Sequence, residues 1–71
     1  MSANRRAVFD EAIERCARCV VLLGAAQVQC ERNAEGASNA AYNETMQLRM
    51  AKDELMSVSS IINALLKTDA A

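Results

Sequence analysis

The residues with the greatest capacity for chemistry are three cysteines, Cys16, Cys19 and Cys30. The spacing Cys16-x-x-Cys19 is that of a redox pair or of half a zinc site. A redox pair of this kind sits at a helix N-terminus, whereas this pair falls within a long helical pattern. A structural zinc ion takes four Cys or His ligands, and the chain has three cysteines and no histidine. We therefore expect free thiols that pack as small apolar residues, with no metal site and no cofactor.

Catalytic constellations are not apparent in the sequence. Without histidine there is no triad or metal dyad, and with only two glycines there is no phosphate-binding loop. The neighbouring carboxylates Asp53 and Glu54 follow Lys52 and are typical of a solvated helix surface. We expect no catalytic residue, and we expect that the protein is not an enzyme.

The composition is that of a helical protein. Proline is absent, the only glycines are Gly24 and Gly36, and good helix formers dominate the chain. A chain of 71 residues makes one domain, and a lone core of this size rarely supplies more than about 3–5 kcal/mol. We therefore expect the core to be completed by oligomerisation or by a partner.

Charge and hydropathy narrow the class of partner. The formal net charge is −1 with both signs interspersed, which disfavours nucleic acid as a ligand. No segment approaches the ~20 continuous apolar residues of a membrane span, so we expect no membrane contact. An odd number of cysteines is typical of a reducing compartment, and we expect a cytoplasmic protein.

The pattern predicts one helical-hairpin domain over residues 1–71. The first helix is expected at about 4–32 and the second at about 39–67, because apolar residues recur at helical spacing in both. The segment 33–38 loses this period and offers Gly36 as a left-handed C-terminal residue. A connection this short makes the helices antiparallel, so the predicted fold is an all-α, coiled-coil-like hairpin.

One apolar stripe on each helix is expected to form the contact between them. Small residues seven apart, Ala12, Cys19 and Ala26, flank the first stripe. An antiparallel pairing brings Phe9 level with Ile62 and Cys30 level with Ala41. The two predicted stripes consist of Phe9, Ile13, Cys16, Val20, Leu23 and Cys30 in the first helix, and Ala41, Leu48, Ala51, Leu55, Val58, Ile62 and Leu65 in the second.

Further apolar residues fall outside these stripes and indicate a binding surface. The first helix is apolar nearly all round after Val20, and such a helix must be covered on more than one side. The second helix carries methionines on a weaker apolar face, and methionine suits an adaptable contact surface. The candidate partner-binding residues are Tyr42, Met46, Met50, Ile61, Leu65, Val21, Leu22 and Val28.

The second helix also resembles a known family. Tyr42 after the turn, the mid-helix Ala51 and the pairs Ile61-Ile62 and Leu65-Leu66 are similar to the small helical-hairpin cochaperones of bacterial type III secretion. The resemblance implies a cytoplasmic role beside a tetratricopeptide-like chaperone. Together the two proteins would keep the needle subunit from polymerising prematurely, with the second helix docked on the larger chaperone.

Three alternatives of other kinds remain. A needle-type structural subunit is also a short helical hairpin, but it usually carries a proline-bearing turn. A homodimeric four-helix bundle that binds RNA would need its arginines on one exposed face. A generic coiled-coil adaptor is the third alternative, and self-association of the isolated chain is compatible with each of them.

Overall fold

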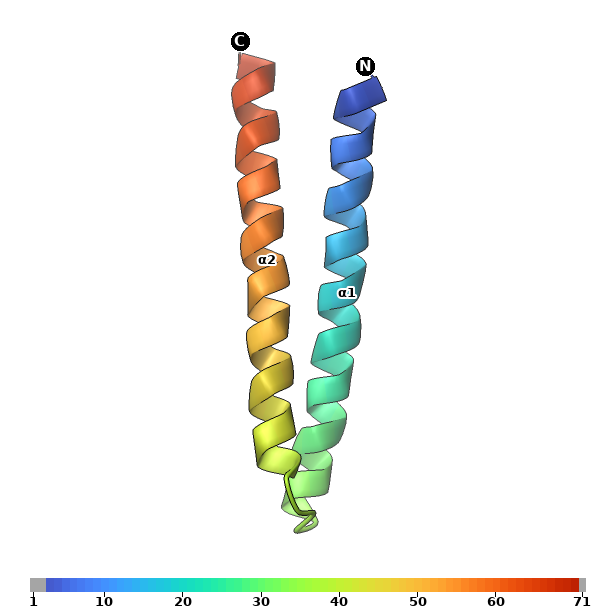
Figure 1. The fold of residues 1–71 in the computed structure, drawn as a ribbon, viewed down its shortest axis with the longest axis vertical. Coiled ribbons are helices and arrows are strands. Elements are labelled where there is room, and N and C mark those ends of the chain that lie inside the picture. The colour runs from blue at the N-terminus through green and yellow to red at the C-terminus, as the bar shows by residue number, and fades with distance from the viewer. Residues whose placement is uncertain (1–2, 71) are drawn as a thin grey trace.

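The structure is a hairpin of two long helices. It is a computed structural model that describes residues 3–70 and the side chains of residues 4–67. Helix α1 spans Ala3–Ala34 and helix α2 spans Ala40–Ala70, so both run past the expected ends at residues 32 and 67. The helices lie antiparallel, with both chain ends at one end and the turn at the other (Figure 1). The predicted all-helical hairpin is confirmed.

The turn is built from a left-handed helix cap. Gly36 has φ +84°, a conformation that L side chains rarely adopt. The Ala37 N–H donates to the Arg32 carbonyl at 2.9 Å, and the Gly36 N–H donates to the Asn33 carbonyl at 3.0 Å, which together make a Schellman motif. Asn39 also has a positive φ of 66°, and its carbonyl accepts the first bond of α2 from the Asn43 N–H.

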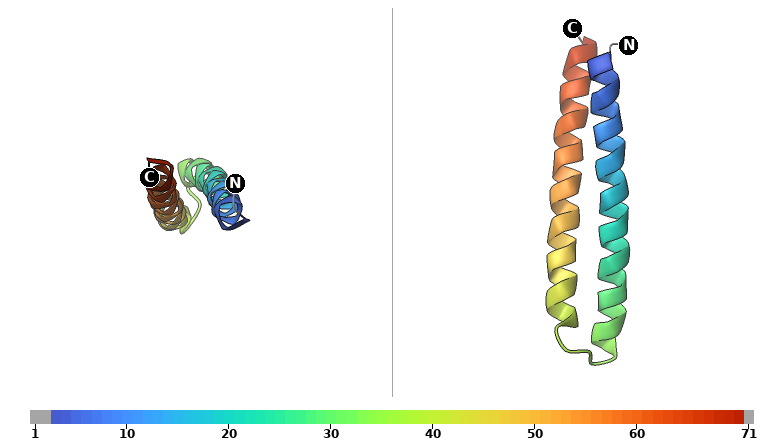
Figure 2. Two further views of the ribbon diagram at one scale, coloured as in Figure 1. Left: turned by 90° about the horizontal axis from the view of Figure 1, so that it is seen from above. Right: turned by 45° about the vertical axis from the view of Figure 1, so that its right-hand side comes forward.

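The two helices form a single layer. The molecule measures 54 × 16 × 11 Å along its principal axes, and in the end-on view of Figure 2 helices α1 and α2 lie side by side. Each helix therefore contacts the other along one side only. In the described part of the chain, no third element covers either broad face of the hairpin.

The contact between the helices uses none of the predicted stripe of α1 and only part of the predicted stripe of α2. In α1 the least exposed residues follow a strict heptad that contains the small flanking row, and in α2 only Ala51, Val58 and Leu65 of the predicted stripe take part. We call this contact the seam. It consists of Arg5, Val8, Ala12, Arg15, Cys19, Leu22, Ala26 and Gln29 in α1, and Ala40, Glu44, Gln47, Ala51, Glu54, Val58, Ile61 and Leu65 in α2.

The size of the side chains explains this choice. Small residues let two helix backbones approach closely, and they account for nearly all of the buried core. Within the described residues, no large side chain is fully buried. The buried residues are Ala12, Cys19, Ala26, Ala40, Ala51 and Val58. The hairpin therefore gains little from the burial of its own large apolar side chains, since that gain scales with apolar area.

Polar groups within the seam fix the register. At the open end, Arg5 Nη2 donates to the Leu65 carbonyl at 3.2 Å. Near the middle, Arg15 Nη1 donates to Glu54 Oε2 at 3.3 Å. Between this pair and the turn, the side-chain oxygens of Gln29 and Gln47 are buried without a hydrogen-bond partner in the structure, which weakens the hairpin because a buried unpaired acceptor is costly.

Candidate protein-binding faces

Two rows of residues flank the seam on each helix, and each pair of rows lies on one broad face. Arg18, just before Cys19, and Met50, just before Ala51, line the same groove. The rows that they represent therefore share one broad face of the hairpin. The other flanking row of α1 contains the residue after Leu22, and the other flanking row of α2 contains the residue after Gln47. These two rows share the opposite broad face.

The first face carries a shallow apolar groove. Its volume is about 450 Å³, and its floor comes from both helices. Val21 is 71% exposed and Met50 is 51% exposed, so both are available to a partner. We call this surface the groove face. Its lining residues are Glu14, Ala17, Arg18, Val21, Leu22, Met50 and Glu54.

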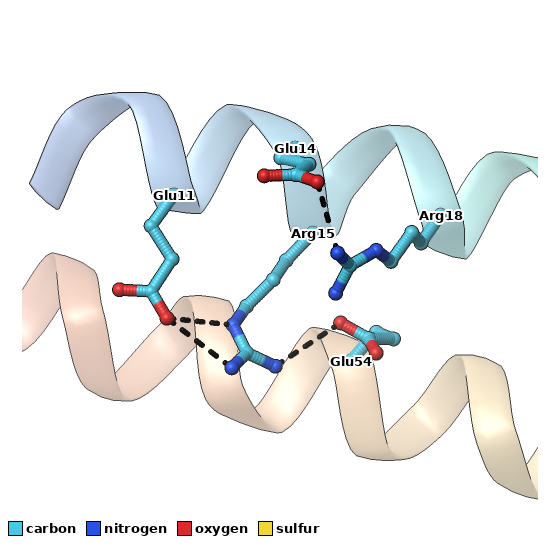
Figure 3. A network of polar contacts seen from close by, with 5 residues as sticks. All are labelled: Glu11, Glu14, Arg15, Arg18 and Glu54. Carbon is cyan, nitrogen blue, oxygen red and sulfur yellow. Dashed lines mark hydrogen bonds and ion pairs between the residues drawn. The ribbon is translucent and has the colours of Figure 1, made fainter. Parts of the chain in front are cut away.

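A network of charges borders the groove (Figure 3). Arg18 Nη2 donates to Glu14 Oε1 at 2.9 Å. Arg15 contacts both helices: it donates to Glu11 Oε1 at 3.2 Å and to Glu54 Oε2 at 3.3 Å. The pKa of Arg15 is raised above its ordinary value, mainly by the hydrogen bond to Glu11 and then by the charge of Glu54. The rim is therefore polar and charged around an apolar floor.

The candidate residues named from the sequence fall in three places. Val21, Leu22 and Met50 come together in the groove. Exposed side chains elsewhere are those of Tyr42, at 67%, and Val28, at 52%, together with the less exposed Met46. Ile61 and Leu65 are half-buried, and both belong to the seam. Sequence reasoning missed Glu14, Arg18 and Glu54, which look like an ordinary solvated surface until the opposite helix is placed.

The opposite face is apolar in both of its rows. Its large members are 37–53% exposed, although none of its eight residues is polar. The groove-side rows are by contrast mixed, since they include Glu11, Arg18 and Ser57. We call the opposite surface the leucine face. It consists of Phe9, Cys16, Leu23, Cys30, Ala41, Leu48, Leu55 and Ile62.

The three cysteines differ in burial. Cys19 is buried in the seam, in agreement with the expectation of apolar packing. Cys16 and Cys30 are exposed on the leucine face, so that expectation is wrong for these two within a single hairpin. All three are free thiols. Among the described residues, no group of three or more His, Cys, Asp or Glu side chains is placed to hold a metal ion.

Of the four arginines that an RNA-binding face would need, Arg5, Arg15 and Arg18 contact other groups of the hairpin, whereas Arg6 is exposed. Arg15 and Arg18 are paired with glutamates, and Arg5 donates to the Leu65 carbonyl and lies 5.7 Å from the centre of the Phe9 ring. Paired cations contribute little to the counterion release that drives nucleic-acid binding.

Within the described residues, no helix has the length and hydropathy needed to cross a membrane.

Comparisons with protein-family models, with curated proteins and with solved structures found no significant match.

Proposed function

We propose that this chain acts by binding another protein through the groove face, and that its specific role is that of a cytoplasmic cochaperone in type III secretion. In that role it would stabilise a tetratricopeptide-like chaperone and, through it, hold the needle subunit in an unpolymerised form. The observation that carries the binding role is the apolar groove formed jointly by Val21, Leu22 and Met50.

Several features of the groove favour a helical partner. A floor of aliphatic and thioether side chains accepts an apolar side chain from a partner helix, as in other helix-in-groove complexes. Methionine adapts to irregular shapes, so Met50 suits the centre of such a contact. The rim charges of Glu14, Arg18 and Glu54 would then select the partner's orientation more than they would add affinity.

The more specific role rests on the resemblance of the second helix to the cochaperones. Tyr42, Ala51 and the Ile61-Ile62 pair carry that resemblance. A tetratricopeptide repeat is itself a helical hairpin, so its surface offers a partner helix of the required kind.

The experiment is affinity purification of the tagged chain from its native host, followed by identification of the proteins that co-elute. The expected result is a tetratricopeptide-like protein in stoichiometric amount, together with a small helical secretion substrate. Failure to recover any helical-repeat protein would refute the cochaperone role. Recovery of a different protein that still needs Met50 would refute that role alone and leave binding through the groove standing.

Two methionines of α2 provide a matched pair of variants. Met50→Asp places a charge in the groove, whereas Met56→Asp places the same charge at a position that is 60% exposed and outside the groove lining. We expect Met50→Asp to abolish co-elution and Met56→Asp to retain it, with circular dichroism showing equal helicity. Equal recovery with both variants would remove the groove from the binding surface.

A further inference from the structure

The leucine face changes in side-chain size along the hairpin. The register places Phe9 level with Ile62 at the open end and Cys30 level with Ala41 near the turn, because Arg5 contacts the Leu65 carbonyl and Arg15 contacts Glu54. The open end of this face is therefore bulky, and the turn end is small. Between them, each level pairs a leucine of α2 with Cys16 or with a leucine of α1.

A second copy of this chain matches this change in side-chain size in only one orientation. If two copies stack with their turns at the same end, one layer holds two phenylalanines and two isoleucines, and another holds only cysteine and alanine. If one copy is reversed end to end, each end layer holds one Phe, one Ile, one Cys and one Ala. Protein interiors have nearly uniform packing density, and large residues are best placed opposite small ones.

We propose that two copies of this chain pair through their leucine faces, reversed end to end, to form a four-helix bundle. In this dimer α1 packs on α1 of the partner copy, with Phe9 opposite Cys30 and Cys16 opposite Leu23. The contact is isologous, since each residue meets the same partner on both copies. The proposal does not depend on the proposed function, because the groove face stays open on both outer sides.

The stripe along α1 also fits this pairing. Phe9, Cys16, Leu23 and Cys30 alternate with Ile13, Val20 and Gln27 at steps of four and three, which is the repeat of a coiled-coil helix. The repeat is centred on Val20, so the reversed copy places Val20 opposite itself. On α2 the corresponding central residue is Lys52, which the same axis places opposite Lys52 of the other copy, and its long stem can carry the ammonium outward into water.

The hairpin is large enough for a stable dimer interface. The outline of its broad side is 54 × 16 Å, or roughly 860 Å², which leaves room for a standard specific interface that buries about 800 Å² of accessible surface on each partner. Several buried seam residues, among them Ala12, Cys19 and Val58, lie in the seam rows next to the leucine face. The bundle would therefore join the small seam residues and the larger leucine-face residues into one core.

The test is sedimentation equilibrium of the full chain across the micromolar range, with adjacent substitutions as a matched pair. We expect a mass of twice 7.7 kDa for the natural sequence. Leu55→Asp, on the leucine face, should yield the monomer mass, whereas Met56→Asp, one residue further round the helix, should retain the dimer. A monomeric natural sequence, or a dimer that survives Leu55→Asp, would overturn the proposal.

The end-to-end reversal has its own test, which does not rely on an interface-breaking variant. A chain with its three cysteines changed to alanine and with Val20→Cys is treated with a short bismaleimide, alongside a matched Val21→Cys chain. We expect covalent dimers from Val20→Cys and few from Val21→Cys, because Val20 lies at the symmetry axis and Val21 lines the groove on the opposite face. Equal cross-linking of the two, in chains of unchanged helicity, would overturn the reversed arrangement.

Discussion

Replacing Gln47 by leucine should stabilise the hairpin. The Gln47 side-chain oxygen is buried in the seam and has no hydrogen-bond partner in the structure. Leaving such an acceptor unpaired costs about 1–3 kcal/mol, and leucine removes this cost while keeping a helix former of similar size. Taking the lower value of about 1 kcal/mol, the unfolding midpoint should rise by roughly 4–8 °C for a domain of this size.

The assay is thermal unfolding followed by circular dichroism, at one fixed protein concentration because association also shifts the midpoint. Asn63→Leu provides the control, since Asn63 is an exposed residue of the same helix. Its effect should be limited to a few tenths of a kcal/mol from helix propensity. An unchanged or lower midpoint for Gln47→Leu would contradict the burial of an unpaired Gln47 oxygen in the seam.

Two further predictions concern the backbone and the ion pairs. Gly24→Ala should stabilise α1 by about 1 kcal/mol, because an added Cβ meets nothing within 4 Å and alanine is the better helix former. Gly36→Ala should destabilise the hairpin by about 1 kcal/mol, because Gly36 has a positive φ. Urea unfolding measures both, and effects of equal sign would contradict the assigned conformations. A double-mutant cycle with Arg15→Ala and Glu54→Ala should yield a small favourable coupling that weakens in high salt; an unfavourable coupling, or one that strengthens in high salt, would contradict this ion pair.

The sequence predicted the fold because its signals are local. The helical period, Gly36 at the C-terminal cap and the short connection are all properties of neighbouring residues, and together they imply an antiparallel hairpin. The packing face of α1 was predicted wrongly for a physical reason, whereas Ala51 and Val58 of the predicted α2 stripe are buried. The row of Phe9 and the row of Ala12 both repeat every seven residues, so period alone cannot choose between them.

Residue size determines which of the two rows faces the other helix. The row of small residues packs there, although the other row is more hydrophobic. The helices meet through Ala12 and its neighbours because small residues permit close approach, and this leaves the bulky row of Phe9 for another surface. The groove was only partly predictable. Val21 and Met50 stood out as surplus apolar residues, but the Arg15–Glu54 contact at its rim depends on the register of two helices, which no local pattern encodes.

We infer that two helices alone do not complete the core of this protein, because no large side chain is fully buried among the described residues. The most direct measurement is the unfolding midpoint of the natural sequence as a function of protein concentration. Association stabilises a folded state by mass action, so the midpoint should rise with concentration and rise again when the co-eluting partner is added. A sharp transition whose midpoint is the same at every concentration, in a species of 7.7 kDa, would contradict the claim.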